Sequence, residues 1–279
     1  MFSSRIQTLI SYLKERQPGA VAFSGGVDST LVLYLAQEAW STPPLALTFV
    51  SPLLPATEQE RIQKLADFLD VRPYFVKTKE YLNLKFNKNT PTRCYYCKQL
   101  RFKQAHPILK ERGIKFLFDG TNADDLKTYR PGIRASREAK VLSPLALFGW
   151  NKEEIRRVSR GLGLPTWNLP SSPCLATRIA YGQTITLPTL KRLASGEEIL
   201  NRMGFSESRL RLHNSLVRIE VPEKEFGLIF DREKKLDLLS RLSALGFHYI
   251  TLDLKGFRSG SMDEAIKIRK RIAREKPRA

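Results

Sequence analysis

The sequence predicts an α/β protein that has a doubly wound parallel sheet and a smaller C-terminal α+β domain. Short apolar runs of strand length alternate with segments of helical periodicity over the first part of the chain. The run Leu45–Val50 is apolar almost throughout, which is typical of a parallel strand covered on both faces. Beyond Gly182 the pattern changes to helix, two strands, helix, strand and a basic final helix. We therefore expect one domain over residues 1–182 and a second over residues 183–279.

The individual elements follow from periodicity and from start and stop signals. Thr57 and Glu60 have the spacing of a capping box, Gly113 ends a helix, and Asn151 caps another. Residues 81–91 are polar and are expected to form a loop. Helices are expected at 2–15, 31–39, 57–69, 94–112, 152–161, 187–203 and 226–245. Strands are expected at 20–23, 45–50, 73–77, 115–118, 208–212, 216–221 and 248–254.

A glycine pair lies between the first expected strand and the helix that follows it. Gly25 and Gly26 have no Cβ, so the backbone can turn sharply and direct its N–H groups at one anion. The unpaired N–H groups and the positive dipole end of the helix favour the same anion. Ser24 and Ser29 offer hydroxyl groups to phosphate oxygens. The pattern is not a Walker loop, because no Gly-Lys-Ser/Thr follows, and a plain strand-to-helix turn is the alternative.

Acidic side chains are expected at the same edge of the sheet. Asp28 cannot favour an anion directly, so it is expected to hold Mg²⁺ or to orient the loop. Asp124 and Asp125 belong to a polar cluster that follows the fourth expected strand. Because ligands bind at the carboxyl ends of parallel strands, this cluster should face the glycine pair and hold Mg²⁺ or the nucleotide. Capping of a helix is the alternative role for these two aspartates.

The formal net charge is +19, from 47 Lys and Arg residues against 28 Asp and Glu residues, which favours anionic partners. Part of the excess lies in a basic tail over residues 267–278, where a solvated helix face is the plainer explanation. No apolar stretch reaches membrane-span length and no signal sequence precedes the first helix, so a cytoplasmic protein without a membrane partner is expected. The odd number of cysteines, Cys94, Cys97 and Cys174, argues against a disulfide framework.

These motifs resemble known sequences. SGGVDS at Ser24–Ser29 is similar to the pyrophosphate loop of the ATP pyrophosphatase (PP-loop) superfamily, whose sheet is Rossmann-like. Together with this loop, further stretches resemble the LarE family: RCYYCK at Arg93–Lys98, DGTNADD at Asp119–Asp125, YRPGIRAS at Tyr129–Ser136, the long segment Ser143–Gly182, and RLRLHNSLVRIEV at Arg209–Val221. The resemblance covers most of the chain.

The LarE resemblance implies an ATP-dependent sulfurtransferase of nickel-pincer nucleotide biosynthesis, which makes the cofactor of lactate racemase. Such an enzyme adenylates the carboxylates of pyridinium-3,5-biscarboxylic acid mononucleotide, releases pyrophosphate and replaces AMP with sulfur to give thiocarboxylates. The expected cofactors are ATP and Mg²⁺, the expected substrate is a small-molecule nucleotide, and the resemblance implies a homo-oligomer. The source of the sulfide is left open.

The cysteines distinguish two branches of the family. In one branch the cysteine of the PCLATR-like motif, here Cys174, gives up its own sulfur and becomes dehydroalanine. In the other branch three cysteines hold a [4Fe-4S] cluster, and Cys94, Cys97 and Cys174 resemble that set. Three thiolates leave one iron without a protein ligand, so that iron can carry an exchangeable sulfide. The alternatives are a zinc site completed by His106, a redox pair of Cys94 and Cys97, and an inert pair beside a donating Cys174.

Two arginines are candidates for binding the substrate phosphate. Arg209 and Arg211 alternate along one expected strand and so share a face, and paired guanidinium groups suit phosphate. A solvated edge strand is the alternative. The resemblance favours phosphate binding by these two residues together with Arg178. Glu197 aligns with a family carboxylate near this site, and its neighbour Glu198 is the alternative for that alignment.

Other functions share part of these features. A tRNA-thiolating enzyme would share the loop, the cluster and the basic surface, but no tRNA-binding module is recognisable, so a nucleic-acid partner is not expected. An enzyme that uses ammonia, as NAD and GMP synthetases do, would need neither Cys174 nor a cluster. A nucleotide-responsive RNA-binding protein would bind ATP without releasing pyrophosphate. AMP release with tRNA or with the pyridinium nucleotide distinguishes these classes.

Overall fold

The computed structural model describes residues 4–170, 173–258, 260–262 and 264. Internal contacts divide the chain into two units: residues 1–86 and 91–173 form the first, and residues 87–90 and 174–279 form the second. The segment from Cys174 to Gly182, which we expected in the first domain, groups with the second unit. The expected basic tail lies outside the described residues.

The first unit contains a four-stranded sheet in the order β3-β2-β1-β4, and every neighbouring pair is parallel. Its strands are β1 (Gly19–Ala22), β2 (Leu45–Val50), β3 (Tyr74–Lys77) and β4 (Phe116–Phe118). The chain proceeds outward from β1 to β3 and then returns to place β4 on the other side of β1. The order therefore reverses between β1 and β4, and the carboxyl ends of these two strands flank a topological switch point, where α/β sheets bind ligands.

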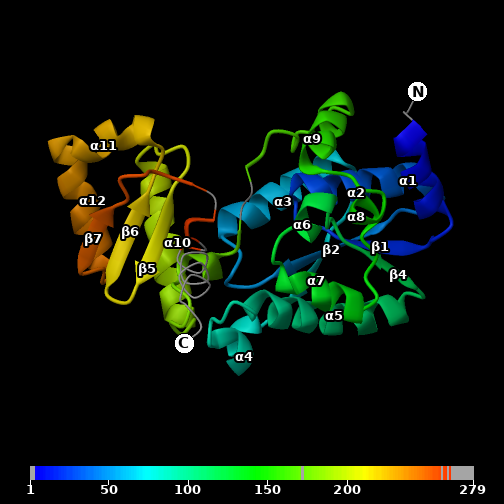
Figure 1. The fold of residues 1–279 in the computed structure, drawn as a ribbon, viewed down its shortest axis with the longest axis horizontal. Helices are drawn as coiled ribbons and strands as arrows, with labels where there is room; N and C mark the ends of the chain where they lie inside the picture. Colours follow the sequence, from blue (N-terminus) through cyan, green and yellow to red (C-terminus); the bar gives the residue numbers. More distant parts are fainter. Residues whose placement is uncertain (1–3, 171–172, 259, 263, 265–279) are drawn as a thin grey trace, which may run out of the picture. The chain divides into compact units, whose positions relative to one another are not determined.

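Helices cover both faces of this sheet, as the doubly wound prediction requires (Figure 1). One face is packed by α1 (Ser4–Lys14), α2 (Val27–Ala39), α3 (Ala56–Phe68) and α9 (Lys152–Gly161). The other face is packed by α5 (Arg93–Glu111). Adjacent residues of β1 alternate between the two cores: Val21 belongs to the first and Ala20 to the second.

Several short helices were not predicted. Residues 81–91 include the end of the 3₁₀ helix Glu80–Leu82 and all of α4 (Leu84–Asn87), so the expected loop was wrong there. Three more helices follow β4: α6 (Ala123–Leu126), α7 (Pro131–Glu138) and α8 (Pro144–Leu147). The capping box at Thr57 was also wrong, because Pro55 is the N-cap of α3 and no side chain caps that helix in the described structure.

The second unit contains a three-stranded sheet in the order β5-β6-β7. β5 (Arg209–His213) pairs antiparallel with β6 (Leu216–Glu220), which pairs parallel with β7 (Tyr249–Leu252). α10 (Leu187–Arg202) packs against β5. The expected helix over 226–245 is interrupted, because Asp231 ends α11 (Phe226–Phe230) and caps α12 (Arg232–Ala244) by accepting from the Lys234 N–H. Throughout the described residues, every helix is too short or too polar to cross a membrane.

Candidate active site

The loop between β1 and α2 has the conformation that the glycine pair predicted. Gly25 has φ +69°, in the left-handed region that favours glycine, and a Cβ there would lie 2.8 Å from Cγ1 of Ile62. Gly26 is the N-cap of α2 with φ −78°, which other residues adopt freely. The Oγ atoms of Ser24 and Ser29 lie 3.1 Å apart. The hydroxyl groups of the two predicted serines are therefore close together in this loop.

Within the described part of the chain, helix α2 has no side-chain cap at its N-terminus. Its first N–H groups have no partner within the helix, and its dipole is positive at this end. Together with the left-handed turn at Gly25, these features are those that favour an anion at a helix N-terminus, and the predicted nucleotide-binding role of the loop stays a prediction.

The loop after β4 lies directly against this site. A Cβ on Gly120 would lie 2.7 Å from the backbone nitrogen of Ser29, so only glycine allows this approach. Asn122 Nδ2 donates to Oδ1 of Asp28 at 3.3 Å. Lys152, the first residue of α9, forms an ion pair with the other oxygen of Asp28. Asp28 therefore links the glycine loop to two other segments, which fits its expected role of orienting the loop.

Asp119 is the buried centre of this second loop. Its carboxylate accepts hydrogen bonds from Ser143 Oγ (2.7 Å), Ser136 Oγ (3.0 Å) and the Thr121 N–H (3.0 Å), and Lys98 Nζ lies 3.2 Å away. Burial raises the pKa of Asp119, but the Lys98 charge and these hydrogen bonds outweigh burial and lower it below its usual value. Asp119 is thus kept ionised and fixes the loop that carries Asn122.

The two predicted aspartates beyond it have different surroundings. Asp125 completes a capping box with Asn122 at the start of α6 and pairs with Arg130 at 3.0 Å, so the capping alternative is confirmed for this residue. Asp124 accepts from the Lys152 N–H at 2.9 Å and from Lys127 Nζ at 2.9 Å. The hydrogen bond from the Lys152 backbone, followed by the one from Lys127, lowers the pKa of Asp124. A role for either aspartate in holding Mg²⁺ or ATP stays a prediction.

Cys94 and Cys97 lie in the first turns of α5 in the same unit. They are three residues apart and so share one face of the helix. Cys94 is exposed, Cys97 is half-buried, and neither is in a disulfide. Cys97 Sγ donates to Oε1 of the buried Glu80 at 3.8 Å, and the same carboxylate pairs with Arg101. Burial raises the pKa of Glu80, but the Arg101 charge outweighs burial and keeps it low.

Cys174 lies in the second unit, immediately before the 3₁₀ helix Leu175–Arg178. Its carbonyl oxygen accepts from the Thr177 N–H at 3.0 Å and from Thr177 Oγ1 at 2.8 Å. Arg178 is 2 % exposed and pairs with Glu197 at 2.8 Å, and Glu197 also accepts from the Leu210 N–H. Glu198 instead pairs with Arg202 on an exposed face. The structure therefore brings Glu197, not its neighbour, into contact with Arg178.

The two predicted strand arginines lie in the same cluster. Arg211 is 4 % exposed, pairs with Glu220 at 2.9 Å and donates to the Thr177 carbonyl at 3.2 Å. Arg209 is half-buried, and its guanidinium lies 5.2 Å from the ring centre of Phe257. Burial lowers the pKa of Arg209, as do the charges of Arg178 and Arg211. β5 is an edge strand of its sheet, but its two arginines do not form a solvated face: Arg211 is buried, Arg209 is half-buried, and both lie in the cluster beside the Cys174 segment.

The chain is similar to several known proteins over nearly its full length. It is 36% identical over 264 residues to the pyridinium-3,5-bisthiocarboxylic acid mononucleotide synthase of Lactiplantibacillus plantarum, an alignment that covers 93% of this chain and 94% of that protein. This chain belongs to the LarE family. Uncharacterized proteins of Synechocystis (36% over 266 residues, 95% and 99% covered) and Methanocaldococcus jannaschii (28% over 263 residues, 93% and 99% covered) are also similar to it.

A weaker similarity reaches another enzyme. Over 201 residues, 62% of this chain and 38% of the relative, it is 27% identical to a glutamine-hydrolyzing GMP synthase of Aeropyrum pernix. No protein-family model matches the chain.

Two of the three cysteines of this LarE-family chain, Cys94 and Cys97, are placed to share a metal centre. Cys94 and Cys97 supply two unbridged sulfur donors from one helix face, which is the donor type that iron–sulfur clusters use. Cys174 is in the other unit, and no three His, Cys, Asp or Glu side chains are gathered at a metal site in the described residues. The three-cysteine cluster stays a prediction.

His106 does not fit a zinc site with the two cysteines. It lies on α5, nine residues after Cys97, and is exposed. In a helix this spacing places His106 about 13 Å from Cys97 along the axis and on the opposite side of the helix. The zinc alternative with His106 as a ligand is therefore wrong.

Sequence reasoning missed several residues of the LarE-family site. Lys152 pairs with Asp28 across 124 positions, and Lys98 reaches Asp119, but long-range ion pairs leave no periodic signal. Glu80 was missed because it lies between the third expected strand and the expected loop, where no element was predicted. Asn122 was within reach, since an Asn three residues before Asp125 is a capping-box pattern.

Proposed function

We propose that this LarE-family chain is an ATP-dependent sulfurtransferase that converts pyridinium-3,5-biscarboxylic acid mononucleotide to its thiocarboxylate. The observation that carries the proposal is the uncapped N-terminus of α2 beside Gly25, at the switch point between β1 and β4. It suits the triphosphate of ATP. The similarity to a pyridinium-3,5-bisthiocarboxylic acid mononucleotide synthase supports the substrate class and the sulfur chemistry.

The proposed reaction has two steps. A substrate carboxylate oxygen attacks the α-phosphorus of ATP, and pyrophosphate leaves with the electron pair of the broken P–O bond. A sulfur nucleophile then attacks the acyl carbon, and AMP leaves with the former carboxylate oxygen. Adenylation is needed because a free carboxylate is a poor electrophile. The N–H groups of α2 would stabilise the negative charge that develops on pyrophosphate, and the Mg²⁺ that accompanies ATP would share it.

The sulfur is proposed to depend on Cys94, Cys97 and Cys174, and the substrate phosphate on Arg178, Arg209 and Arg211. If the three thiolates held a [4Fe-4S] cluster, it would supply an iron without a protein ligand, where sulfide could exchange. The arginine cluster supports phosphate binding because its guanidinium groups outnumber the carboxylates, Glu197 and Glu220, that pair with them. The neighbouring positive charges of Arg178, Arg209 and Arg211 repel one another. A phosphate dianion bound beside them would reduce this repulsion.

Pyrophosphate and AMP release test the proposal. The protein is incubated with ATP and Mg²⁺, and either pyridinium-3,5-biscarboxylic acid mononucleotide, bulk tRNA, or ammonia with nicotinate adenine dinucleotide or xanthosine monophosphate. We expect release of both products with the pyridinium nucleotide alone. Release with tRNA would instead indicate a tRNA-thiolating enzyme, and release with ammonia would indicate a synthetase. ATP binding without release under any condition would contradict an enzymatic role.

A further inference from the structure

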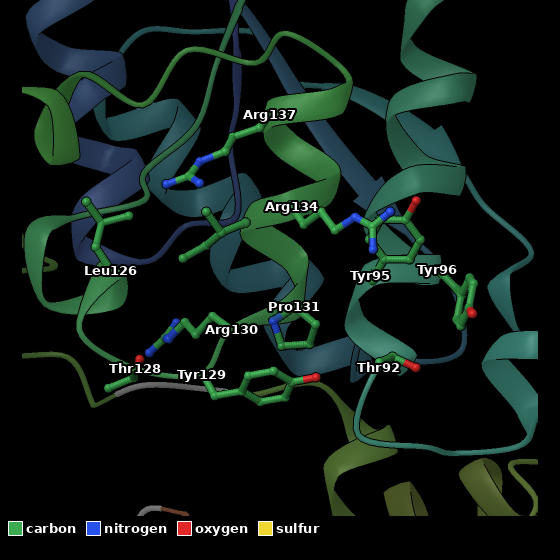
Figure 2. A pocket seen from close by; sticks show the side chains of 11 residues that line it. Thr92, Tyr95, Tyr96, Leu126, Thr128, Tyr129, Arg130, Pro131, Arg134 and Arg137 are labelled. Carbon is green, nitrogen blue, oxygen red and sulfur yellow. The ribbon is translucent and has the colours of Figure 1, made fainter.

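A cavity of about 510 Å³ lies beside the first turns of α5 and is separate from the glycine loop. It is lined by that turn, by the segment between α6 and α7, and by α7 itself (Figure 2). All of its residues belong to the first unit. The volume is within the usual range for small-molecule sites, and neither the glycine loop nor the arginine cluster of the second unit accounts for it.

The cavity is rich in guanidinium groups with spare hydrogen-bond donors. Arg137 lines it, is exposed, and has no acidic partner within the described residues. Arg130 pairs with Asp125 at 3.0 Å but keeps further N–H donors, since a guanidinium carries five. Arg134 is engaged by Glu138 at 2.7 Å. The cavity therefore offers an unneutralised charge at Arg137, and carboxylate or phosphate is the group that a guanidinium fork binds best.

Aromatic rings form another part of the lining. Tyr95 is fixed, because its hydroxyl donates to Glu138 at 2.6 Å and the guanidinium of Arg134 lies 5.1 Å from its ring centre. Tyr129 is 67% exposed and Leu126 is 48% exposed, so the cavity leaves apolar surface uncovered. Figure 2 shows Arg137 toward Leu126, and Tyr95 and Tyr96 at the other end. This arrangement suits a flat ring that carries an acidic group.

Hydrogen bonds and packing link the lining of the cavity to both reactive parts of the first unit. Arg130 pairs with Asp125, whose carboxylate accepts from the N–H of Asn122, and Asn122 in turn donates to Asp28 in the glycine loop. On its other side, a Cβ on Gly132 would lie 3.6 Å from the carbonyl oxygen of Cys94, so α7 rests on the cysteine turn. A carboxylate that is adenylated and then thiolated must lie between a nucleotide and a sulfur source.

We propose that this cavity binds the dicarboxylated pyridinium ring of the substrate, with Arg137 on a carboxylate and the tyrosine rings against the ring face. The assignment rests on the proposed function and names the ring subsite within it. A pyridinium ring is cationic, so it is attracted to the electron-rich face of a tyrosine, while its carboxylates are attracted to guanidinium groups. ATP itself has neither a cationic ring nor a carboxylate.

Binding of 1-methylpyridinium-3,5-dicarboxylate to the full-length protein tests this assignment by titration calorimetry. We expect the wild type to bind this probe, and 1-methylpyridinium, which lacks the carboxylates, to bind far more weakly. Arg137→Gln should weaken binding of the dicarboxylate about ten- to a hundredfold, because it removes a charge-assisted hydrogen bond. Arg137→Lys should give an intermediate affinity. Arg157→Gln, which changes an exposed arginine of α9 outside the cavity, should leave the affinity unchanged.

Two results would overturn the assignment: a wild type that does not bind the probe, or an Arg137→Gln protein that binds it as well as the wild type does. ATP affinity is measured on the same variants and should not change, which excludes misfolding as the cause of lost probe binding. Pyrophosphate release by the wild type with the full nucleotide is scored separately. Its absence would count against the proposed function, whereas probe binding independent of Arg137 counts against the subsite alone.

Discussion

Neighbouring glycines in the loop after β1 have different structural requirements. Gly25 has a positive φ, and a side chain there would collide with the buried Ile62. Gly26 has an extended conformation, and its Cβ would meet only Ser24 Oγ at 3.5 Å, an ordinary contact. The backbone therefore requires glycine at position 25, whereas position 26 is the N-cap of α2, where serine is also favoured.

Gly25→Ser should lower the free energy of unfolding by about 1–2 kcal/mol, because it combines a left-handed conformation with a close contact. Gly26→Ser should change the same free energy by less than about 0.5 kcal/mol, since serine is a good N-cap. Urea unfolding of the two variants measures the difference. Equal losses at both positions would show that the loop conformation is not the one described.

For single residues, the sequence predicts which side chains contact a ligand but not which other side chains they bond to. The left-handed turn at Gly25 and the serine pair follow from local chemistry. The partners of Asp28 do not, because Asn122 and Lys152 approach it only through the order of the strands. Arg211 was predicted as a ligand residue, yet it is also a buried structural partner of Glu220, which the two-residue spacing does not reveal.

At the scale of elements, Asp119 connects the end of β4 to α5 and α7. Its carboxylate lies against Lys98 of α5 and Ser136 of α7, and against Ser143, the N-cap residue of α8. The Asp119 side chain is 8% exposed, so these neighbours rather than water stabilise its charge. These contacts hold the loop that places Asn122 against the glycine loop.

Asp119→Asn should lower the free energy of unfolding by about 2–3 kcal/mol at neutral pH, because it leaves Lys98 and the hydroxyl donors without their charged acceptor. The folded pKa of Asp119 is below its ordinary value of 3.8. Its contribution to stability is therefore fully present above that value and is lost as the pH falls below it toward the folded pKa.

Unfolding free energies of wild type and Asp119→Asn between pH 7 and pH 2.5 check this prediction. The difference between them should shrink as the pH falls below about 4. The matched variant Asp67→Asn changes an aspartate of α3 with no charged partner in the described structure, and should follow the wild type. A constant difference across the whole range would contradict an ionised Asp119.

The long elements could be predicted from the sequence, and the short ones could not. β2 was predicted at its observed bounds, and α5 and α9 within a residue or two, because periodicity over many residues or a cap such as Asn151 marks them. Helices α6 and α8 span four residues each, too few for periodicity, and form through contacts with neighbouring segments. The cavity beside α7 was missed because α7 itself was not predicted, although Pro131 in the first turn of α7 is a helix start signal.

At the scale of the whole molecule, the candidate chemistry is divided between the two units. The first unit carries the glycine loop with Cys94 and Cys97, and the second carries Cys174 with the arginine cluster. The presence of two units was predictable, because the order of expected helices and strands changes beyond Gly182. The assignment of residues 174–182 to the second unit was not predictable. That segment joins the second sheet through a bridge between Ile179 and Leu212, a contact without a local signal.

This division makes the cysteines a test of whether the two units act together. If a [4Fe-4S] cluster is held by Cys94, Cys97 and Cys174, anaerobically purified protein should contain about four irons per chain. Cys→Ser at any one position should abolish both the iron and repeated turnover, since each thiolate is one of three ligands. His106→Ala, which changes an exposed residue on the opposite side of α5, should retain both.

Sulfur donation by Cys174 alone gives a different pattern. Product would then form at most once per chain, Cys174 would become dehydroalanine, and Cys94→Ser and Cys97→Ser would stay active. Iron content, product per chain and the mass of the peptide that contains residue 174, measured on the same preparations, separate the two outcomes. Iron lost equally from all three variants requires ligands from both units, since Cys94 and Cys97 lie in the first and Cys174 in the second.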